Sequence, residues 1–146
     1  MTAGNPTPEA LILHASTVSF AGRGLVILGP SGSGKSALAL HLMAWGADLV
    51  ADDRTEVFCD QDRLMARSPP ALTGLIEARG LGILRVPTIA QTEVMLIADL
   101  GQKETDRLPP HRNLTILGRV CPLVHGAGND HFPASVLCYL KGSRHA

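Results

Sequence analysis

The chain has 146 residues, 45% of them hydrophobic and 18% charged, which is the composition of one folded globular domain and excludes a largely disordered chain. Thirteen basic side chains balance thirteen acidic ones, so no overall field draws the protein onto nucleic acid or an anionic membrane. No stretch approaches the ~20 apolar residues that span a bilayer. Cys59, Cys121 and Cys138 have no CxxC spacing and favour neither a disulfide framework nor a zinc site, so we expect them to be reduced thiols in the core. We therefore expect a cytoplasmic protein with no nucleic-acid or membrane partner.

The first half of the chain predicts an α/β fold, with a P-loop nucleotide-binding core, a mixed and largely β-rich sheet, and few helices. Residues 1–9 are expected to be a flexible N-terminus, followed by one domain over residues 10–146. The expected elements, in chain order, are a hairpin over 11–28, a glycine-rich loop over 29–34, a helix over 36–45, a strand over 48–51 and a hairpin over 55–66.

The second half gives weaker signals. Glycines in segment 72–84 indicate turns or close backbone approach rather than a regular helix. Residues 94–100 predict a buried strand, and the charged, proline-rich segment 101–112 predicts an exposed loop. A short strand over 114–117 should precede a loop rich in Gly, Asn and His. The last apolar segment, 134–140, is too short to assign to a helix or a strand.

The glycine-rich loop matches the phosphate-binding motif G-x-x-x-x-G-K-[ST] and stands between an expected strand and an expected helix, as that motif requires. In such a loop, backbone N–H groups and the helix N-terminus surround a phosphate, the lysine neutralises β/γ oxygens, and the hydroxyl is placed to bind Mg²⁺. The predicted nucleotide-binding residues are Gly29, Pro30, Ser31, Gly32, Ser33, Gly34, Lys35 and Ser36.

An acid pair, Asp52 and Asp53, ends the strand expected over 48–51. An apolar strand that delivers carboxylates to Mg²⁺ and the γ-phosphate is a Walker B element. Adjacent strand residues point to opposite faces, so the two acids should have different roles unless the backbone turns there. A solvated turn capped by aspartates is the alternative interpretation.

Four elements in collinear order resemble the HPr kinase/phosphorylase family of bacteria. His14 lies shortly before the P-loop, and Val50-Ala51-Asp52-Asp53 is similar to the family's V-A-D-D element. The segment from Ile76 to Ile83 resembles the signature I-E-x-R-G-L-G-I, and Thr105-Asp106-Arg107 resembles Y-D-R. The chain looks like a short form of the enzyme, similar to the C-terminal catalytic domain and to the α-proteobacterial type.

The resemblance implies an ATP- and Mg²⁺-dependent serine kinase that acts on an HPr-type phosphocarrier protein. It implies that Asp53 accepts the serine proton, with His14 beside it and Arg107 as a catalytic arginine. Lys35 would act on the phosphates, while Ser36, Asp52 and Glu77 would bind the metal. A purely structural His14 and a solvated Arg107 remain the alternatives. Family members are commonly hexameric, which implies a homo-oligomer.

One family element is not recognisable. The sequence from Cys121 to Gly126 stands where the family has I-P-V-R-P-G-R-N, and it contains neither arginine. The resemblance therefore implies kinase activity but leaves phosphorolysis of the phosphoserine doubtful.

Two other functions remain open on the sequence. One is a P-loop kinase of a small metabolite, although the chain shows no obvious lid to enclose such an acceptor. The other is a nucleotide-sensing regulatory module that binds ATP without transferring phosphate.

Overall fold

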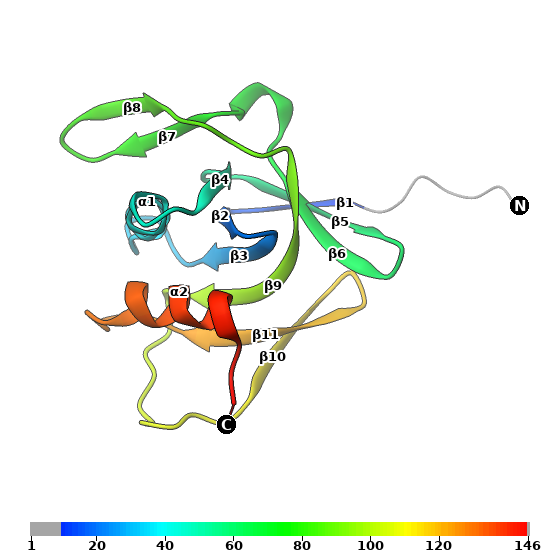
Figure 1. Cartoon of the computed structure of the whole chain (residues 1–146), viewed down its shortest axis with the longest axis vertical. Helices are drawn as coiled ribbons and strands as arrows, with labels where there is room; N and C mark the ends of the chain where they lie inside the picture. Colours follow the sequence, from blue (N-terminus) through cyan, green and yellow to red (C-terminus); the bar gives the residue numbers. More distant parts are fainter. Residues whose placement is uncertain (1–9, 146) are drawn as a thin grey trace, which may run out of the picture.

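The computed structural model describes residues 10–145, and Figure 1 shows two helices beside a large, strongly twisted sheet. The helical segments are α1 (Lys35–Ala44), the short 3₁₀ helix η1 (Pro70–Leu72) and α2 (Phe132–Gly142). The strands are β1 (Ala10–Leu13), β2 (Ala15–Phe20), β3 (Arg23–Leu28), β4 (Asp48–Ala51), β5 (Thr55–Asp60), β6 (Arg63–Arg67), β7 (Leu75–Ala78), β8 (Gly82–Arg85), β9 (Gln91–Asp99), β10 (Arg112–Ile116) and β11 (Arg119–His125).

Strand β9 is the hub of the main sheet. It pairs in parallel with β3 along one edge, while its other edge pairs with β6 at its start and in parallel with β11 at its end. The remaining order is β1-β5-β6 on one side and β3-β2-β4 on the other, and β7 and β8 form a separate two-stranded sheet. Because β3, β9 and β11 run in parallel, the loops that follow them leave the same edge of the sheet.

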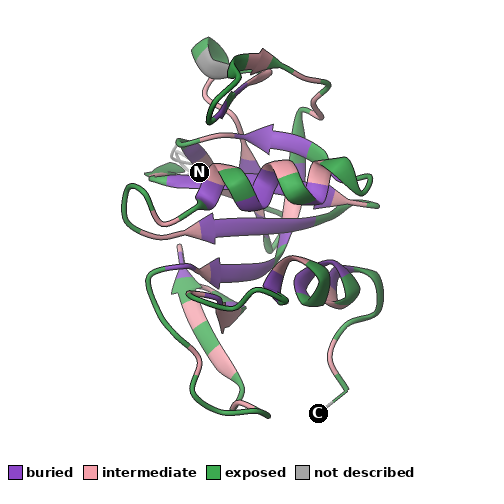
Figure 2. Ribbon diagram, turned by 90° about the vertical axis from the view of Figure 1, so that its left-hand side faces the viewer, coloured by how far each residue is buried: buried purple, intermediate pink, exposed green. Residues whose placement is uncertain are grey.

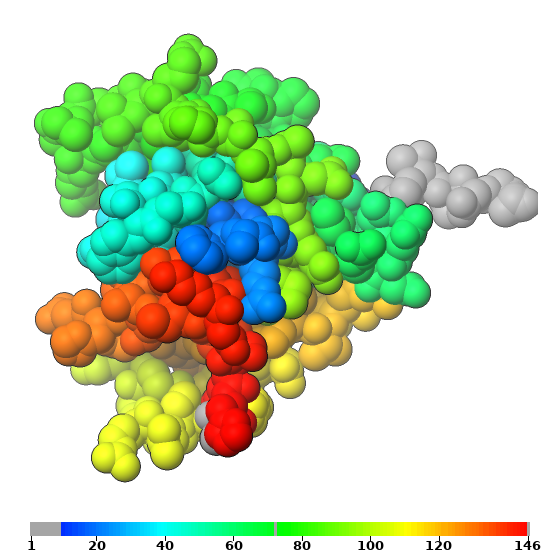
Figure 3. Space-filling model, in the orientation of Figure 1, coloured from blue at the N-terminus to red at the C-terminus, as the bar shows by residue number. Residues whose placement is uncertain are grey.

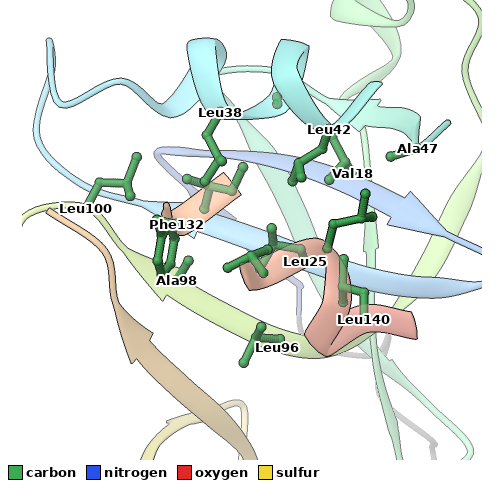
Figure 4. Close-up of a cluster of buried hydrophobic side chains, with 14 of the residues drawn as sticks. Val18, Leu25, Leu38, Leu42, Ala47, Leu96, Ala98, Leu100, Phe132 and Leu140 are labelled. Atoms are coloured by element: carbon green, nitrogen blue, oxygen red, sulfur yellow. The ribbon is translucent and has the colours of Figure 1, made fainter. Parts of the chain in front are cut away.

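A hydrophobic core lies between this sheet and the two helices. Figure 4 shows Leu38 and Leu42 of α1 and Phe132 and Leu140 of α2 pointing toward side chains of the central strands, including Leu25. Most residues of these strands are buried, as the purple ribbons of Figure 2 show. Truncating a side chain such as Leu42 to alanine would cost about 2–5 kcal/mol, because the surrounding structure closes such a cavity only partly.

A second hydrophobic cluster lies on the face of the main sheet that is turned away from the helices. It includes side chains of the outer strands β5, β6, β10 and β11. It contains Cys121, and burial raises the pKa of this thiol, with the nearby Glu93 as a smaller cause. Cys59 packs against the same cluster, whereas Cys138 is exposed on α2. The interpretation of all three cysteines as core thiols was therefore wrong for Cys138.

The predicted fold class is confirmed: the fold is α/β, rich in mixed sheet, with two α-helices in the described part. The expected helix over 36–45 and the strand over 48–51 correspond to α1 and β4. Three strands were missed, since segment 72–84 forms most of the β7–β8 hairpin and part of the loop expected after residue 117 forms β11. The predicted flexible N-terminus, residues 1–9, lies outside the described residues. No helix within residues 10–145 is long and apolar enough to cross a membrane.

Candidate active site

The glycine-rich loop lies between β3 and α1, as its motif predicted. Gly29 has φ +151, and a Cβ built on it would stand 2.4 Å from the Ser33 Oγ, so a side chain there would require Ser33 to shift. Gly34, the residue before α1, has φ +100, which favours glycine. The loop thus closes tightly and directs the free N–H groups of the first helical turn outward, the arrangement that binds anions.

Lys35 is the first residue of α1 and, at 7% exposure, is almost buried. Its Nζ donates hydrogen bonds to the carbonyl oxygens of Gly29, at 2.9 Å, and Pro30, at 3.1 Å. The stem is therefore packed against the protein while the ammonium group is held at the mouth of the loop.

Asp52 lies between two serine hydroxyls. Strand β4 pairs antiparallel with β2 with Ala51 opposite Thr17, so the next position along β4 faces Ser16. The hydroxyls of Ser16 and Ser36 each donate to Asp52 Oδ1 at 2.7 Å. The Glu77 N–H lies 3.4 Å from the other oxygen, Oδ2. One carboxylate thus joins β2, the first turn of α1 and the β7–β8 hairpin.

Asp53 points elsewhere because the backbone turns at this residue. Its φ is +65, a left-handed conformation that aspartate tolerates better than most residues. Its Oδ1 lies 2.7 Å from His14 Nε2, and both side chains are more than half exposed. The acid pair therefore occupies two environments, one enclosed by hydroxyls and one open to solvent.

A cleft of about 610 Å³ connects these groups. Its lining residues from the β7–β8 hairpin are Glu77, Ala78, Arg79 and Leu81; from the loop and α1 they include Ser31, Lys35 and Ser36; and His14 and Asp53 complete it. The hairpin packs on α1, as the space-filling view of Figure 3 shows for the green and cyan segments. The hairpin therefore forms a wall of the cleft, although the sequence had shown no obvious lid.

Arg107 lies apart from this cluster. It is exposed on the loop between β9 and β10, and it is not among the residues that line the cleft. Figures 1 and 2 place this loop at the opposite end of the molecule's long axis from the β7–β8 hairpin. Glu104 fixes the loop: both of its carboxylate oxygens bind the Arg112 guanidinium, at 3.2 and 3.0 Å. Of the predicted loop residues, Gly29, Pro30 and Ser33 do not themselves line the cleft, but they belong to the loop that borders it. Arg107 belongs neither to that loop, nor to the cleft lining, nor to the contacts of Asp52.

Ser16 is a site residue that the sequence did not reveal. It is fully buried, and a serine in the middle of a strand has no motif of its own. The only signal in the sequence was weak: Ser16 follows His14 by two positions in a segment expected to be one strand, but the chain bends at His14 between β1 and β2.

Comparison with known proteins gives the family. Residues 7–107 match the model described as HPr Serine kinase C-terminal domain. The chain is 35% identical over 137 residues to an HPr kinase/phosphorylase of Aromatoleum aromaticum, covering 81% of this chain and 44% of that protein. It is 42% identical over 88 residues to an HPr kinase/phosphorylase of Limosilactobacillus reuteri, covering 60% of this chain and 28% of that protein.

A solved structure has the same fold. The HPr(Ser) kinase/phosphatase from Coxiella burnetii superposes with a TM-score of 0.78 at 25% identity, covering 90% of this chain and 94% of that one. The chain spans 28% to 44% of the length of the curated relatives named above. The matched family model, the identities and the shared fold agree, and the chain belongs to the HPr serine kinase C-terminal domain family.

Proposed function

We propose that this chain is an ATP- and Mg²⁺-dependent kinase that transfers the γ-phosphoryl group to a serine of an HPr-type phosphocarrier protein. The observation that carries the proposal is the convergence, in and beside one cleft, of a complete phosphate-binding loop, Asp52 on Ser36, and an exposed Asp53 oriented by His14. Membership of the HPr serine kinase family supplies the acceptor class.

The donor set fits Mg²⁺. Ser36 Oγ and Asp52 Oδ1 lie 2.7 Å apart and are hard oxygen donors, and Glu77 lines the cleft beside them. Among the residues that the structure describes, no three His, Cys, Asp or Glu side chains form a metal-binding group, so phosphate oxygens and water would complete the coordination. When bound, the ion would neutralise phosphate charge and orient the γ-phosphoryl group.

The side chains then have separate tasks. Lys35 and the N–H groups at the start of α1 hold the phosphates of ATP. The acceptor serine oxygen attacks the γ-phosphorus, the bond to the β,γ-bridging oxygen breaks, and ADP leaves. The serine proton passes to Asp53, whose Oδ1 contacts His14 and whose exposed carboxylate can be reached by an acceptor. Arg107 would stabilise charge on the transferred group from a neighbouring subunit of a homo-oligomer, since it does not line the cleft of its own chain.

The test is incubation of the purified chain with γ-labelled ATP, Mg²⁺ and HPr proteins, followed by mapping of the labelled residue. Label on an HPr serine supports the proposal. Label on a small metabolite, or nucleotide binding without any transfer, would instead support the metabolite kinase or the nucleotide sensor.

We further propose that the opposing activity, in which inorganic phosphate attacks the phosphoserine and releases serine and pyrophosphate, is weak. β11 ends at His125, and the segment from Cys121 to His131 contains no arginine to hold inorganic phosphate. Incubation of phosphoserine HPr with the chain, Mg²⁺ and millimolar phosphate should release pyrophosphate much more slowly than the kinase reaction proceeds. Comparable rates would show that the missing arginines are not needed.

A further inference from the structure

Ser16 lies at the junction of the two acids. It is the second residue of β2 and has no exposed surface, and its hydroxyl contacts the Asp52 carboxylate. The antiparallel register between β2 and β4 carries it to the acid pair, and the Ala15 N–H donates to the Asp53 carbonyl oxygen at 3.1 Å. The Ser16 side chain is therefore fixed by backbone pairing on both of its neighbours.

The hydroxyl contacts both acids in different ways. It donates its hydrogen to Asp52 Oδ1 at 2.7 Å, and its oxygen lies 3.4 Å from the Asp53 N–H, which donates to it. A serine hydroxyl has one hydrogen to give and lone pairs to accept, so the two contacts use complementary capacities. Ser16 thus anchors the carboxylate of one acid and the backbone of the other.

These contacts hold the Asp52 and Asp53 side chains in their two different environments. With Ser16 and Ser36 both on Oδ1, the Asp52 carboxylate is oriented toward the start of α1. The Asp53 backbone stays in a left-handed conformation that costs free energy and has to be supported by its surroundings. Without the Ser16 hydroxyl, Asp52 Oδ1 would lose one of its two serine donors, and the Asp53 N–H would lose its side-chain acceptor.

A second buried serine on the same strand gives the comparison. Ser19 is 1% exposed and accepts a hydrogen bond from Thr92 Oγ1 at 2.9 Å, so it is a serine of similar burial whose partner is a neutral hydroxyl instead of a carboxylate. Its partner belongs to β9 and has no contact with the acids. Loss of the Ser19 hydroxyl therefore measures the cost of a buried serine alone.

We infer that Ser16 is a positioning residue, which sets Asp52 toward the cation and Asp53 toward the acceptor. The inference rests on the proposed kinase function for its meaning, whereas the Ser16 contacts from which it is argued do not depend on that function.

The experiment compares Ser16→Ala, Ser16→Thr and Ser19→Ala in the full chain. Ser16→Ala should lower kcat for HPr phosphorylation ~10- to 100-fold, the range expected when one hydrogen bond to a charged group is lost, with an unchanged KM for HPr. It should also weaken binding of Mn²⁺ in the presence of ADP, measured by electron paramagnetic resonance, and speed hydrogen exchange of the Asp53 amide. Ser16→Thr keeps the hydroxyl and should restore most of the kcat, the Mn²⁺ binding and the protection of the Asp53 amide.

Ser19→Ala should lower the unfolding midpoint without changing Mn²⁺ binding or kcat. Equal effects of Ser16→Ala and Ser19→Ala, or wild-type Mn²⁺ binding and kcat in Ser16→Ala, would overturn the inference. The two proposals fail separately: a wild-type chain that phosphorylates no HPr sinks the proposed function, while the Mn²⁺ and amide measurements still decide the role of Ser16.

Discussion

The cleft and the loop that carries Arg107 are held in place by different means. At the cleft, His14, Asp52 and Asp53 lie at the ends of paired strands, and Ser36 lies in the first turn of α1, whose buried face packs on the sheet. Loop 101–111 has no ladder of its own. It is held by the Glu104–Arg112 pair, by a hydrogen bond from the Ala127 N–H to the Gln102 carbonyl oxygen, and by Arg144, which donates to the Pro109 carbonyl oxygen.

The difference shows which parts of a site a single chain can preorganise. Groups on strand ends are fixed by many backbone hydrogen bonds, so the distances among the acids, the serines and His14 come with the fold. A group on an exposed loop is fixed by a few side chains, and its partner need not belong to the same chain. The comparison thus predicts a cleft that works in cis and an arginine that works in trans.

The largest effect is expected from the phosphate-binding lysine. Lys35→Met keeps the packed stem but removes the ammonium group, so phosphotransfer should fall ~1000-fold or more. Its unfolding midpoint should stay near that of the wild type, because the methionine fills the same buried space. Labelled-ATP transfer and thermal unfolding measure the two quantities. Near-normal transfer would contradict the role given to the cleft.

Arg107 tests the trans half of the comparison. Arg107→Ala should lower transfer about 1000-fold, as expected for an arginine that stabilises transition-state charge, and leave ATP binding intact. In an oligomer assembled from equal amounts of Arg107→Ala and Asp53→Asn chains, about a quarter of the sites combine a good cleft with a good neighbour, if contacts are head-to-tail. Activity in the mixture that exceeds the sum of the two variants shows action in trans. Its absence would place Arg107 in its own cleft or outside the reaction.

Asp53→Asn should lower kcat about 100-fold while ATP affinity stays unchanged, because it removes the proton acceptor but keeps the phosphate loop. Asparagine also tolerates the left-handed backbone at this position, so the turn is preserved. Asp53→Ala is the matched variant that adds backbone strain, and it should unfold at a lower temperature. A fall in ATP affinity with unchanged kcat would make Asp53 a binding residue.

The sequence was most informative where the chemistry is local. The P-loop needs its glycines, lysine and serine at fixed spacing between a strand and a helix, so motif and structure coincide. The strand carrying the acids was also predicted, but their division depended on a positive φ at Asp53 that no pattern of side chains indicates.

Long-range register explains what was missed. β11 contains Pro122 and little alternation, and it becomes a strand because it pairs with both β9 and β10. The β7–β8 hairpin has a glycine-rich turn that looked irregular, although its inner residues Ile76 and Ala78 are buried against α1. Ser16 became visible as a site residue only when the pairing of β2 with β4 placed it opposite Asp52.

The smallest effect is expected from pH on loop 101–111. The Arg112 guanidinium lowers the pKa of the Glu104 carboxyl below its ordinary value of 4.5, outweighing the opposite effect of desolvation, with help from the Asp106 and Thr105 amides. A carboxyl with a lowered pKa in the folded state stabilises the loop above pH 4.5, and that contribution is lost as the pH falls through the lowered value.

In a pH titration by NMR, the amide shifts of Thr105 and Asp106, which donate to Glu104 Oε2 at 3.1 and 3.2 Å, should therefore move together with a midpoint below 4.5. Glu104→Gln should abolish this transition, and Arg112→Gln should bring the midpoint up toward 4.5 because the main cause of the lowered pKa is gone. The effect on global unfolding should be slight, since a partly exposed ion pair contributes little. A wild-type midpoint at or above 4.5 would mean that Glu104 does not hold the loop, and the position of Arg107 would then depend on contacts with a neighbouring subunit.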